Sequence, residues 1–442
     1  MGWANYNSGG GRLMRAIFSI VLVLVLGVFG VSAGAAGNPV SPLPDAVAPV
    51  PQPDYSDKLL GDWGGKRSEM SAKGYDWEVV YKLDMLRKMS NPNRKNYGMD
   101  NLDIKLSLDG EKIAGLKGGS ALLYVLSNHG SKPAVQGDHS AGLSNIETSE
   151  GGNTAKLYQA WIQQTFLDER LSVLAGLYDF NSEFYATETS GIFIQPTYGI
   201  GPEMAGTGQN GPSIFPTTSF ALRAKAEARG YYVQAVTLDG VPGDPKNPHG
   251  THVQFNKGDG ALNAVEVAMP LSVAENAHDN KLALGVWRYT ARFDDLLDTD
   301  VNGNPIKRVS NGYYAIIEKV LRYKPGSNEG SINSFVRGGK TDAATSQFDM
   351  SWSAGLVFSG LLPGRDQDQL GFAYAQERNG AKYLAVAGNP AVLSEKSVEL
   401  TYRFQAMSGL VLQPNVQYLI NHSSDPAQNK SWWLDLRLEA AF

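Results

Sequence analysis

The chain has 442 residues, no cysteine and a formal net charge of −5. The lack of cysteine excludes a disulfide scaffold, a thiolate metal site and a cysteine nucleophile, and an acidic chain without a basic block is a poor nucleic-acid binder. A mean hydropathy of −0.25 excludes a membrane protein built from many apolar helices.

The first residues have the three parts of an export signal. Arg12 and Arg15 precede a continuous apolar run from Ala16 to Val31, and Ala33-Gly34-Ala35 supplies the small residues of a cleavage site. The run is shorter than the about 20 residues that a spanning helix needs. We therefore expect a cleaved signal peptide over residues 1–35 and not a transmembrane anchor.

A Pro-rich stretch and a short helical piece follow the signal. Residues 36–55 are rich in Pro and Ala, which predicts an extended, flexible arm. Residues 56–75 contain an amphipathic piece that stops at Gly74, a residue type that commonly ends helices. We expect a short periplasmic helical segment here.

From Asp76 onward the chain alternates apolar and polar residues in segments of strand length. In 431–442, for example, the apolar parity is Leu434, Leu436, Leu438, Ala440 and Phe442, and the polar parity is Asp435, Arg437 and Glu439. A period of two indicates strands with one apolar face. The predicted strands are 76–87, 100–109, 118–128, 155–167, 171–181, 216–228, 230–240, 261–270, 281–292, 311–322, 332–340, 351–359, 369–378, 395–406, 409–421 and 431–442. The faces of 311–322 and 332–340 do not sort cleanly.

Three features favour a membrane barrel over a soluble sandwich or propeller, which also alternate. Charges occupy consecutive positions of one face, as suits a wet lumen, and aromatic pairs such as Tyr231-Tyr232, Tyr313-Tyr314 and Trp432-Trp433 resemble interfacial girdles. Phe442 ends the last strand on its apolar face, a mark of bacterial outer-membrane barrels.

Connection lengths agree with that interpretation in part. The connections 168–170, 229 and 407–408 are very short, whereas 129–154, 182–215, 241–260 and 293–310 are long, as expected of inner turns and outer loops. The inner connections 271–280, 323–331 and 360–368 are longer than this pattern predicts. The predicted fold is an all-β, 16-stranded antiparallel transmembrane β-barrel of the bacterial outer membrane over 76–442.

Several segments resemble one known family, and together they span about residues 58–442. The segments are Leu60–Arg67, Gly176–Phe184, Gly199–Glu203, Asn210–Pro216, Leu238–Pro245, Gly258–Ala261 and Leu412–Tyr418. In this order they resemble the carbohydrate-selective porin family OprB, with Tyr178 standing where Leu or Phe is expected. The resemblance implies a sixteen-stranded barrel that passes monosaccharides; the Pro-rich arm is not part of it.

The third outer connection, 182–215, is the candidate for a constriction loop folded into the barrel. Its many Gly and Pro residues suit a tight path, and irregular backbone at membrane depth requires a wet or protein-filled cavity. The alternative is an exposed surface loop.

Sugar contacts need planar polar groups and an aromatic face, and the strand 155–167 offers both. Trp161 shares the polar parity with Gln159 and Gln163, whereas Tyr158 falls on the other parity. Trp161 then either stacks on a sugar or packs beneath the folded loop; both alternatives remain open.

Further candidates for the substrate pathway are charged or lie near the third and fourth outer loops. Arg223, Arg403 and Arg437 fall on lumen-facing parities and could donate to sugar hydroxyls, or only balance neighbouring carboxylates. The remaining candidates lie at outer strand ends, where turn capping is the alternative role: Tyr178, Asp179, Asn181, Glu183 and Asp239.

Signals for an enzyme or a metal are weak. His249-Gly250-Thr251-His252 has the wrong spacing for a helical ligand pair, and Asp298–Asn304 lacks the closing Glu of a calcium loop. No G-x-S-x-G motif is present, so a barrel hydrolase has no support. We predict no catalytic residues, no metal site and no cofactor.

The predicted function is passive, carbohydrate-selective diffusion of glucose-type monosaccharides into the periplasm. The alternatives are a general, weakly selective porin and an exopolysaccharide-associated channel. The expected partners are monosaccharides, outer-membrane lipid with lipopolysaccharide, and the barrel-assembly machinery through Phe442. Nucleic acid is not among them, and homo-oligomerisation is left open.

Overall fold

The computed structural model describes residues 54–89, 96–130, 142–146, 153–271, 280–324, 330–387, 392–422 and 430–442. The predicted signal peptide and nearly all of the Pro-rich arm lie outside these residues. Within them, every helix is too short or too polar to cross a bilayer.

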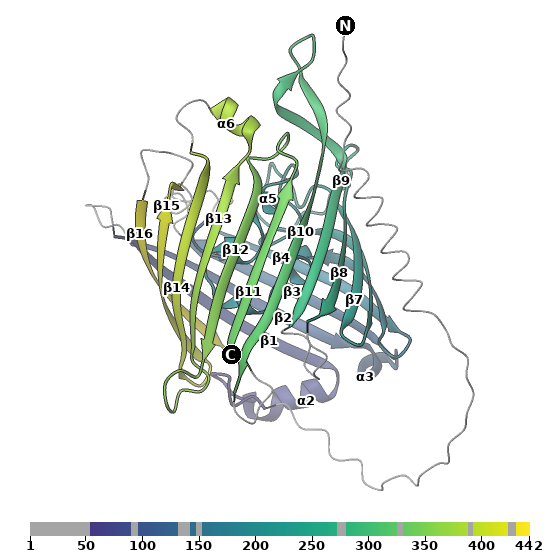
Figure 1. Ribbon diagram of the computed structural model, residues 1–442. Helices are drawn as coiled ribbons and strands as arrows, with labels where there is room; N and C mark the ends of the chain where they lie inside the picture. The colour runs from purple at the N-terminus through teal and green to yellow at the C-terminus, as the bar shows by residue number, and fades with distance from the viewer. Residues whose placement is uncertain are drawn as a thin grey trace, which may run out of the picture. The chain divides into compact units, whose positions relative to one another are not determined.

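Sixteen antiparallel strands close into one barrel, in which each strand pairs with its sequence neighbours and β1 pairs with β16 (Figure 1). The strands are β1 (Tyr75–Lys88), β2 (Asn96–Asp109), β3 (Gly119–Gly130), β4 (Thr154–Phe166), β5 (Leu171–Tyr178), β6 (Ser219–Ala228), β7 (Tyr231–Asp239), β8 (Ala261–Pro270), β9 (Lys281–Thr299), β10 (Pro305–Tyr323), β11 (Gly330–Thr341), β12 (Phe348–Ser359), β13 (Gln369–Asn379), β14 (Ser394–Met407), β15 (Leu410–Ile420) and β16 (Lys430–Ala441). Closure leaves no sheet edge with unpaired backbone groups, as a membrane requires. The predicted barrel and strand order are confirmed.

Short helices lie outside the strand order. They are η1 (Trp63–Gly65), α2 (Lys66–Ala72), α3 (Gly110–Ala114), η2 (Phe180–Ser182), η3 (Thr189–Ile192), η4 (Pro196–Tyr198), α5 (Pro202–Ala205) and α6 (Ala381–Ala387). η1 and α2 form the short helical segment expected before the barrel, and Gly74 follows them with a φ of +92°.

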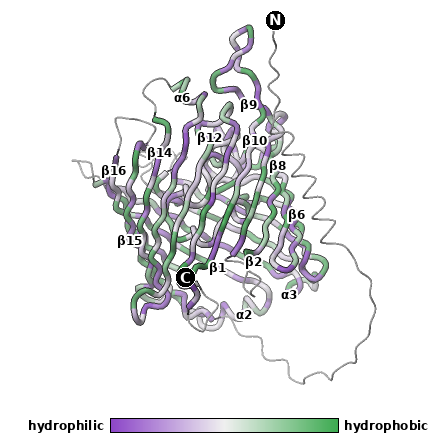
Figure 2. Tube along the Cα trace, in the orientation of Figure 1, coloured by the Kyte–Doolittle hydropathy of each residue, from purple (hydrophilic) through white to green (hydrophobic). Residues whose placement is uncertain are grey.

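The two faces of each strand sort by polarity, and the hydropathy colours alternate along the strands (Figure 2). In β16, Leu434 and Leu436 are exposed on the outer surface, whereas Asp435 and Arg437 are buried inside. The pairing of β1 with β16 brings Asp84 opposite Arg437 at the seam where the barrel closes. The predicted parity of the last strand is therefore correct.

The inner face of β10 explains why its pattern did not sort from the sequence. Tyr314, Ile316 and Val320 point inward and are buried, although they are apolar or aromatic. Tyr314 and Ile316 pack in an apolar cluster inside the barrel, so this wall contacts protein instead of water. Inward apolar residues remove the polarity contrast on which periodicity depends.

Two sequence expectations about strands were wrong in detail. The segment 293–310 is not a long outer loop, because β9 and β10 extend into a hairpin whose tip contains Asp300–Asn304. Asp300 accepts hydrogen bonds there from the backbone N–H groups of Asn302 and Asn304. Tyr158 points inward because a β-bulge beside Tyr124 shifts the register and reverses the parity of β4.

Only one residue of each aromatic pair faces the outside of the barrel, where an aromatic girdle would lie. Tyr231, Tyr313 and Trp432 are exposed on the outside, as an interfacial belt requires. Their sequence neighbours point inward, where Tyr314 and Trp433 are fully buried and Tyr232 donates to Glu266. Adjacent residues of a strand face opposite sides, so only one member of a pair can contact lipid.

Candidate functional site

The connection between β5 and β6, residues 179–218, packs against the inner wall of the barrel. Phe184, Tyr185 and Met204 from this inward segment are fully buried with wall residues of β9 and β10. The rings of Tyr185 and Tyr314 stack with centroids 4.0 Å apart and an interplanar angle of 14°. Apolar burial thus fixes the inward segment, which has only short helical turns of its own.

Wall carboxylates accept hydrogen bonds from the backbone of the inward segment. Glu399 accepts from the N–H groups of Ile194 and Gln195 at 2.7 and 3.0 Å. Glu266 accepts from the N–H of Tyr185 at 3.0 Å, and Glu318 from that of Thr189 at 2.5 Å. These bonds satisfy backbone groups that an irregular, buried segment would otherwise leave unpaired.

Arg337 of β11 makes the complementary contacts to backbone carbonyl groups. Its guanidinium donates to the carbonyl oxygens of Thr197 at 2.5 Å and Gly199 at 2.6 Å, and lies 5.5 Å from the ring centroid of Tyr185. Gln413 donates to the carbonyl of Ile192 at 2.6 Å. The sequence analysis missed both anchors. The polar parity of Gln413 was visible in the sequence, but the faces of 332–340, which contains Arg337, did not sort, and neither partner could be predicted.

Glu203 of α5 is a buried carboxyl within the inward segment. It accepts hydrogen bonds from the Tyr185 hydroxyl at 3.0 Å and from the Ser351 hydroxyl. Burial raises the pKa of Glu203 above its ordinary value. Gly339 leaves room for this group, because a Cβ atom there would collide with the Glu203 carboxylate.

Arg223 and Glu183 form a closed polar cluster with several predicted site residues. The Arg223 Nε and Nη2 atoms donate to the Glu183 carboxylate at 2.8 and 3.1 Å, and Nη2 also donates to Gln163 at 2.8 Å. Tyr178 donates to the same carboxylate. The Arg223 side chain is 3% exposed, so its donors are directed to protein acceptors.

Trp161 lies beside this cluster and packs against the inner apolar cluster. Its indole N–H donates to the Gln159 amide oxygen at 3.2 Å, and the side chain is half-buried. The structure therefore brings together Trp161, Gln159, Gln163, Arg223, Tyr178 and Glu183. The proposed sugar contact at Trp161 stays a prediction.

Asp179, Asn181 and Asp239 lie at strand ends. Asp179 accepts from the Tyr158 hydroxyl at 2.7 Å and from the backbone N–H of Asn181 at 2.8 Å, and burial raises its pKa to about 6. Asn181 donates to the carbonyl of Phe184 at 3.2 Å. Asp239 ends β7, where its carbonyl accepts from Ser219 at 3.0 Å.

The two remaining arginines differ in their environment. Arg437 makes a bidentate ion pair with Asp84 at 2.6 and 2.7 Å and also donates to Asn145, and its side chain is 7% exposed. Arg403 donates to Glu439 at 3.0 Å, but its side chain is 33% exposed. Arg403 is thus the more accessible of the two.

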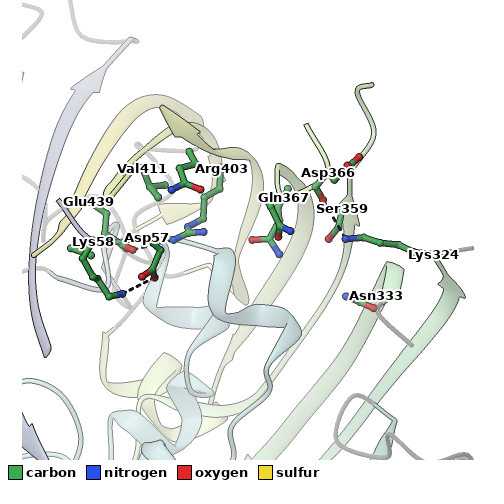
Figure 3. Close-up of a pocket in the computed structure, with 14 residues that line it drawn as sticks. Asp57, Lys58, Lys324, Asn333, Ser359, Asp366, Gln367, Arg403, Val411 and Glu439 are labelled. Carbon is green, nitrogen blue, oxygen red and sulfur yellow. Dashed lines mark hydrogen bonds and ion pairs between the residues drawn. The ribbon is translucent and has the colours of Figure 1, made fainter. Parts of the chain in front are cut away.

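Arg403 lines two cavities inside the barrel. The inner cavity, of about 380 Å³, is bounded on one side by Glu188, Thr189, Gly191 and Ile192 of the inward segment. The periplasmic cavity, of about 670 Å³, reaches the inner turns and the residues before α2 (Figure 3). Four residues belong to both cavities: Asn333, Gln369, Arg403 and Glu439.

These four residues combine complementary hydrogen-bonding groups. They offer a guanidinium donor, a carboxylate acceptor, the Gln369 amide, which can donate and accept, and the Asn333 amide, whose oxygen is buried. They come from β11, β13, β14 and β16 near the strand ends that meet the inner turns. The arrangement can exchange hydrogen bonds with a small polar solute without taking part in covalent chemistry.

Comparisons with known proteins agree with this architecture. The profile of the OprB family of carbohydrate-selective porins matches residues 97–442. Porin B of Pseudomonas aeruginosa is 25% identical over 394 residues, covering 82% of this chain and 86% of that protein. The putative porin QuiX of Acinetobacter baylyi is 22% identical over 416 residues, covering 87% and 93% of the two chains.

A solved structure has the same fold. The high-pH structure of Pseudomonas putida OprB superposes with a TM-score of 0.75 at 22% identity, covering 89% of this chain and 100% of that one. The family match spans most of the chain, and the closed barrel of sixteen strands agrees with it. The chain belongs to the OprB family of carbohydrate-selective porins and is an outer-membrane diffusion channel for carbohydrates.

Proposed function

We propose that monosaccharides of the glucose type cross the barrel through the inner and periplasmic cavities, with residues 182–215 as the constriction. The observation that carries this proposal is the shared wall of Asn333, Gln369, Arg403 and Glu439, which continues from the inward segment to the periplasmic end. The inner cavity of about 380 Å³ lies at the small end of the about 300–1,000 Å³ typical of small-molecule sites.

The Arg403–Glu439 pair suits weak binding of a neutral sugar. Each partner is already engaged at 3.0 Å, and both side chains remain partly exposed, at 33% and 25%. A sugar hydroxyl can therefore replace a water molecule beside either group without leaving a charge unpaired. Conduction needs such a weak site, because a tightly bound solute would not leave the channel.

Sugar block of ion current tests this proposal. We expect Arg403→Gln to raise the half-blocking glucose concentration about three- to tenfold, the size of one net hydrogen bond. Lys307→Gln is the matched control, because it also removes a cation but lies in the β9–β10 hairpin, paired with Asp294 at 2.7 Å.

An unchanged half-blocking concentration in Arg403→Gln, with normal block in the control, would contradict the assigned path. If sugar does not block the ion current of the wild-type channel and sugar flux does not saturate, the result would instead favour the general, weakly selective porin. Passage of polysaccharide would favour the exopolysaccharide-associated channel.

The proposal extends to assembly through Phe442. Its backbone N–H donates to the Val79 carbonyl at 2.9 Å, which places this residue at the β1–β16 seam. We expect recognition of the last strand by the barrel-assembly machinery to require Phe442. Deletion of Phe442 should lower the amount of heat-modifiable barrel in outer membranes; normal amounts would contradict this role.

A further inference from the structure

Residues 54–59 dock on the periplasmic end of the barrel before α2 begins. The backbone N–H of Leu59 donates to the Ala441 carbonyl at 2.8 Å, and the Ser408 hydroxyl donates to the Ser56 carbonyl. Gly409 makes this contact possible, because a Cβ atom there would collide with the Leu59 backbone nitrogen. The docked residues thus contact the end of β16 and the turn between β14 and β15.

Arg67 of α2 provides a second anchor. Its guanidinium donates to the carbonyl oxygens of Trp77 at 2.6 Å and Phe442 at 2.8 Å, which lie on the two sides of the β1–β16 seam. It also lies 4.8 and 4.5 Å from the ring centroids of Tyr55 and Trp63. Arg67 is almost fully buried, so residues 54–67 are held at a defined position on the barrel.

This docked segment contributes charges to the wall of the periplasmic cavity. Asp57 and Lys58 line the cavity together with Arg403 and Glu439 (Figure 3). The Lys58 ammonium lies 2.9 Å from the Asp57 carboxylate, and the Lys58 side chain is only 26% exposed. The charged lining residues balance: three cations, Lys58, Lys324 and Arg403, and three carboxylates, Asp57, Asp366 and Glu439.

We propose that residues 54–67 form part of the rim of the pore exit, and that Lys58 is a determinant of its charge selectivity. The inference rests on the proposed function, since it assumes that solutes leave through the periplasmic cavity. It assigns a role in selectivity to a segment outside the barrel strands. A balanced set of charges on the cavity wall suits a neutral polar solute, because it orders hydroxyl groups without attracting ions of one sign.

Charge reversal at Lys58 is the direct test. Lys58→Glu leaves two cations against four carboxylates around the exit. In a salt gradient near 0.1 M we expect the cation-to-anion permeability ratio to rise about two- to fourfold, and to rise less at 1 M because the screening length falls from about 10 to 3 Å. Lys58→Gln should give a smaller shift in the same direction.

Lys66→Glu is the matched control. Lys66 carries the same charge on the same segment, but it is 73% exposed, pairs with Glu69 at 3.4 Å and does not line the periplasmic cavity. We expect its permeability ratio to remain that of the wild type. Equal shifts in Lys58→Glu and Lys66→Glu, or no shift in either Lys58 variant, would overturn the proposal.

A further variant tests whether the docked position of Lys58 matters. Arg67→Ala should release the docked segment without changing any lining charge, so it should reduce the effect of a Lys58→Glu change made in the same chain.

If Lys58 variants leave selectivity unchanged while Arg403→Gln weakens sugar block, the rim proposal fails and the proposed path stands. If Lys58 variants change selectivity while Arg403→Gln leaves block intact, the proposed sugar path through Arg403 fails, and Lys58 still controls the charge selectivity of the exit.

Discussion

Two parts of the inner wall carry arginines that point into the barrel, but the arginines differ in how accessible they are to a solute. At the closed wall, Arg223, Arg337 and Arg437 are buried and bound to carboxylates or backbone carbonyl groups. At the open wall, Arg403 borders two cavities and keeps a third of its side chain exposed. Strand parity therefore sets where an arginine points, and the segments folded inside the barrel decide whether a solute can reach it.

The largest expected effect comes from removing a closed-wall arginine. Arg437→Leu leaves the buried Asp84 carboxylate without its bidentate partner, which should cost about 3–5 kcal/mol of unfolding free energy. Arg403→Leu removes a partly exposed ion pair, which should cost about 0–1 kcal/mol. Urea unfolding of the refolded barrels measures both, and similar losses would remove the distinction between the two walls.

The next effect concerns the anchor of the inward segment. Arg337→Lys keeps the charge but loses the planar fork that donates to Thr197 and Gly199, and each unpaired buried carbonyl should cost about 1–3 kcal/mol. We expect the inward segment to loosen, with higher ion conductance and noisier open-channel current. Arg322→Lys is the control, since Arg322 is exposed on β10; equal noise in both variants would contradict the anchoring role.

Trp161→Ala tests whether the closed wall contributes to sugar block. Trp161 packs against the inner apolar cluster and donates to Gln159, and it does not line either of the two cavities. We expect less assembled barrel but an unchanged half-blocking glucose concentration in the channels that do assemble. Loss of block in this variant would instead support stacking of the sugar on the indole.

The smallest expected effect is a pH dependence at Glu203. Its folded pKa is raised by burial, so its contribution to stability is fully present below the unfolded pKa and is lost as pH rises through the folded pKa. Among the described residues, the groups that interact with it are Tyr185, Ser351, Arg337 and the buried carboxyl of Glu377.

Glu203→Gln should therefore melt like the wild type near pH 4 and at a higher temperature than the wild type at pH 8. Thermal unfolding monitored by heat modifiability gives both values. A difference that does not change with pH would show that titration of Glu203 does not affect stability.

The sequence predicted the barrel well because lipid imposes a strict period of two on most strands. It failed where this contrast is interrupted. The bulge in β4 turns Tyr158 inward, and Tyr314 and Ile316 face protein inside the barrel. The orientation of these three residues could not be assigned from polarity alone. The extended β9–β10 hairpin continues beyond the predicted strand ends of 292 and 311.

The sequence predicted which candidate side chains point into the barrel, but not which of them a solute can reach. Parity placed Arg223, Arg403 and Arg437 inside the barrel, and each is found there. The partner of a buried arginine can lie far away in the sequence, as Asp84 does from Arg437. No local pattern could therefore show which arginine a solute cannot reach. The exit residues Asp57 and Lys58 were missed because they precede the first strand.

Cysteine accessibility tests the open wall most directly, because the natural chain contains no cysteine. Gln369→Cys lies on the wall shared by both cavities, and Gln234→Cys lies on the closed wall, where Gln234 donates to Glu266 at 2.9 Å. We predict that a charged thiol reagent rapidly reduces the current of Gln369→Cys channels, that glucose slows this reaction, and that Gln234→Cys channels react slowly with no protection by glucose. Rapid, glucose-protected reaction at position 234, or none at position 369, would contradict the account.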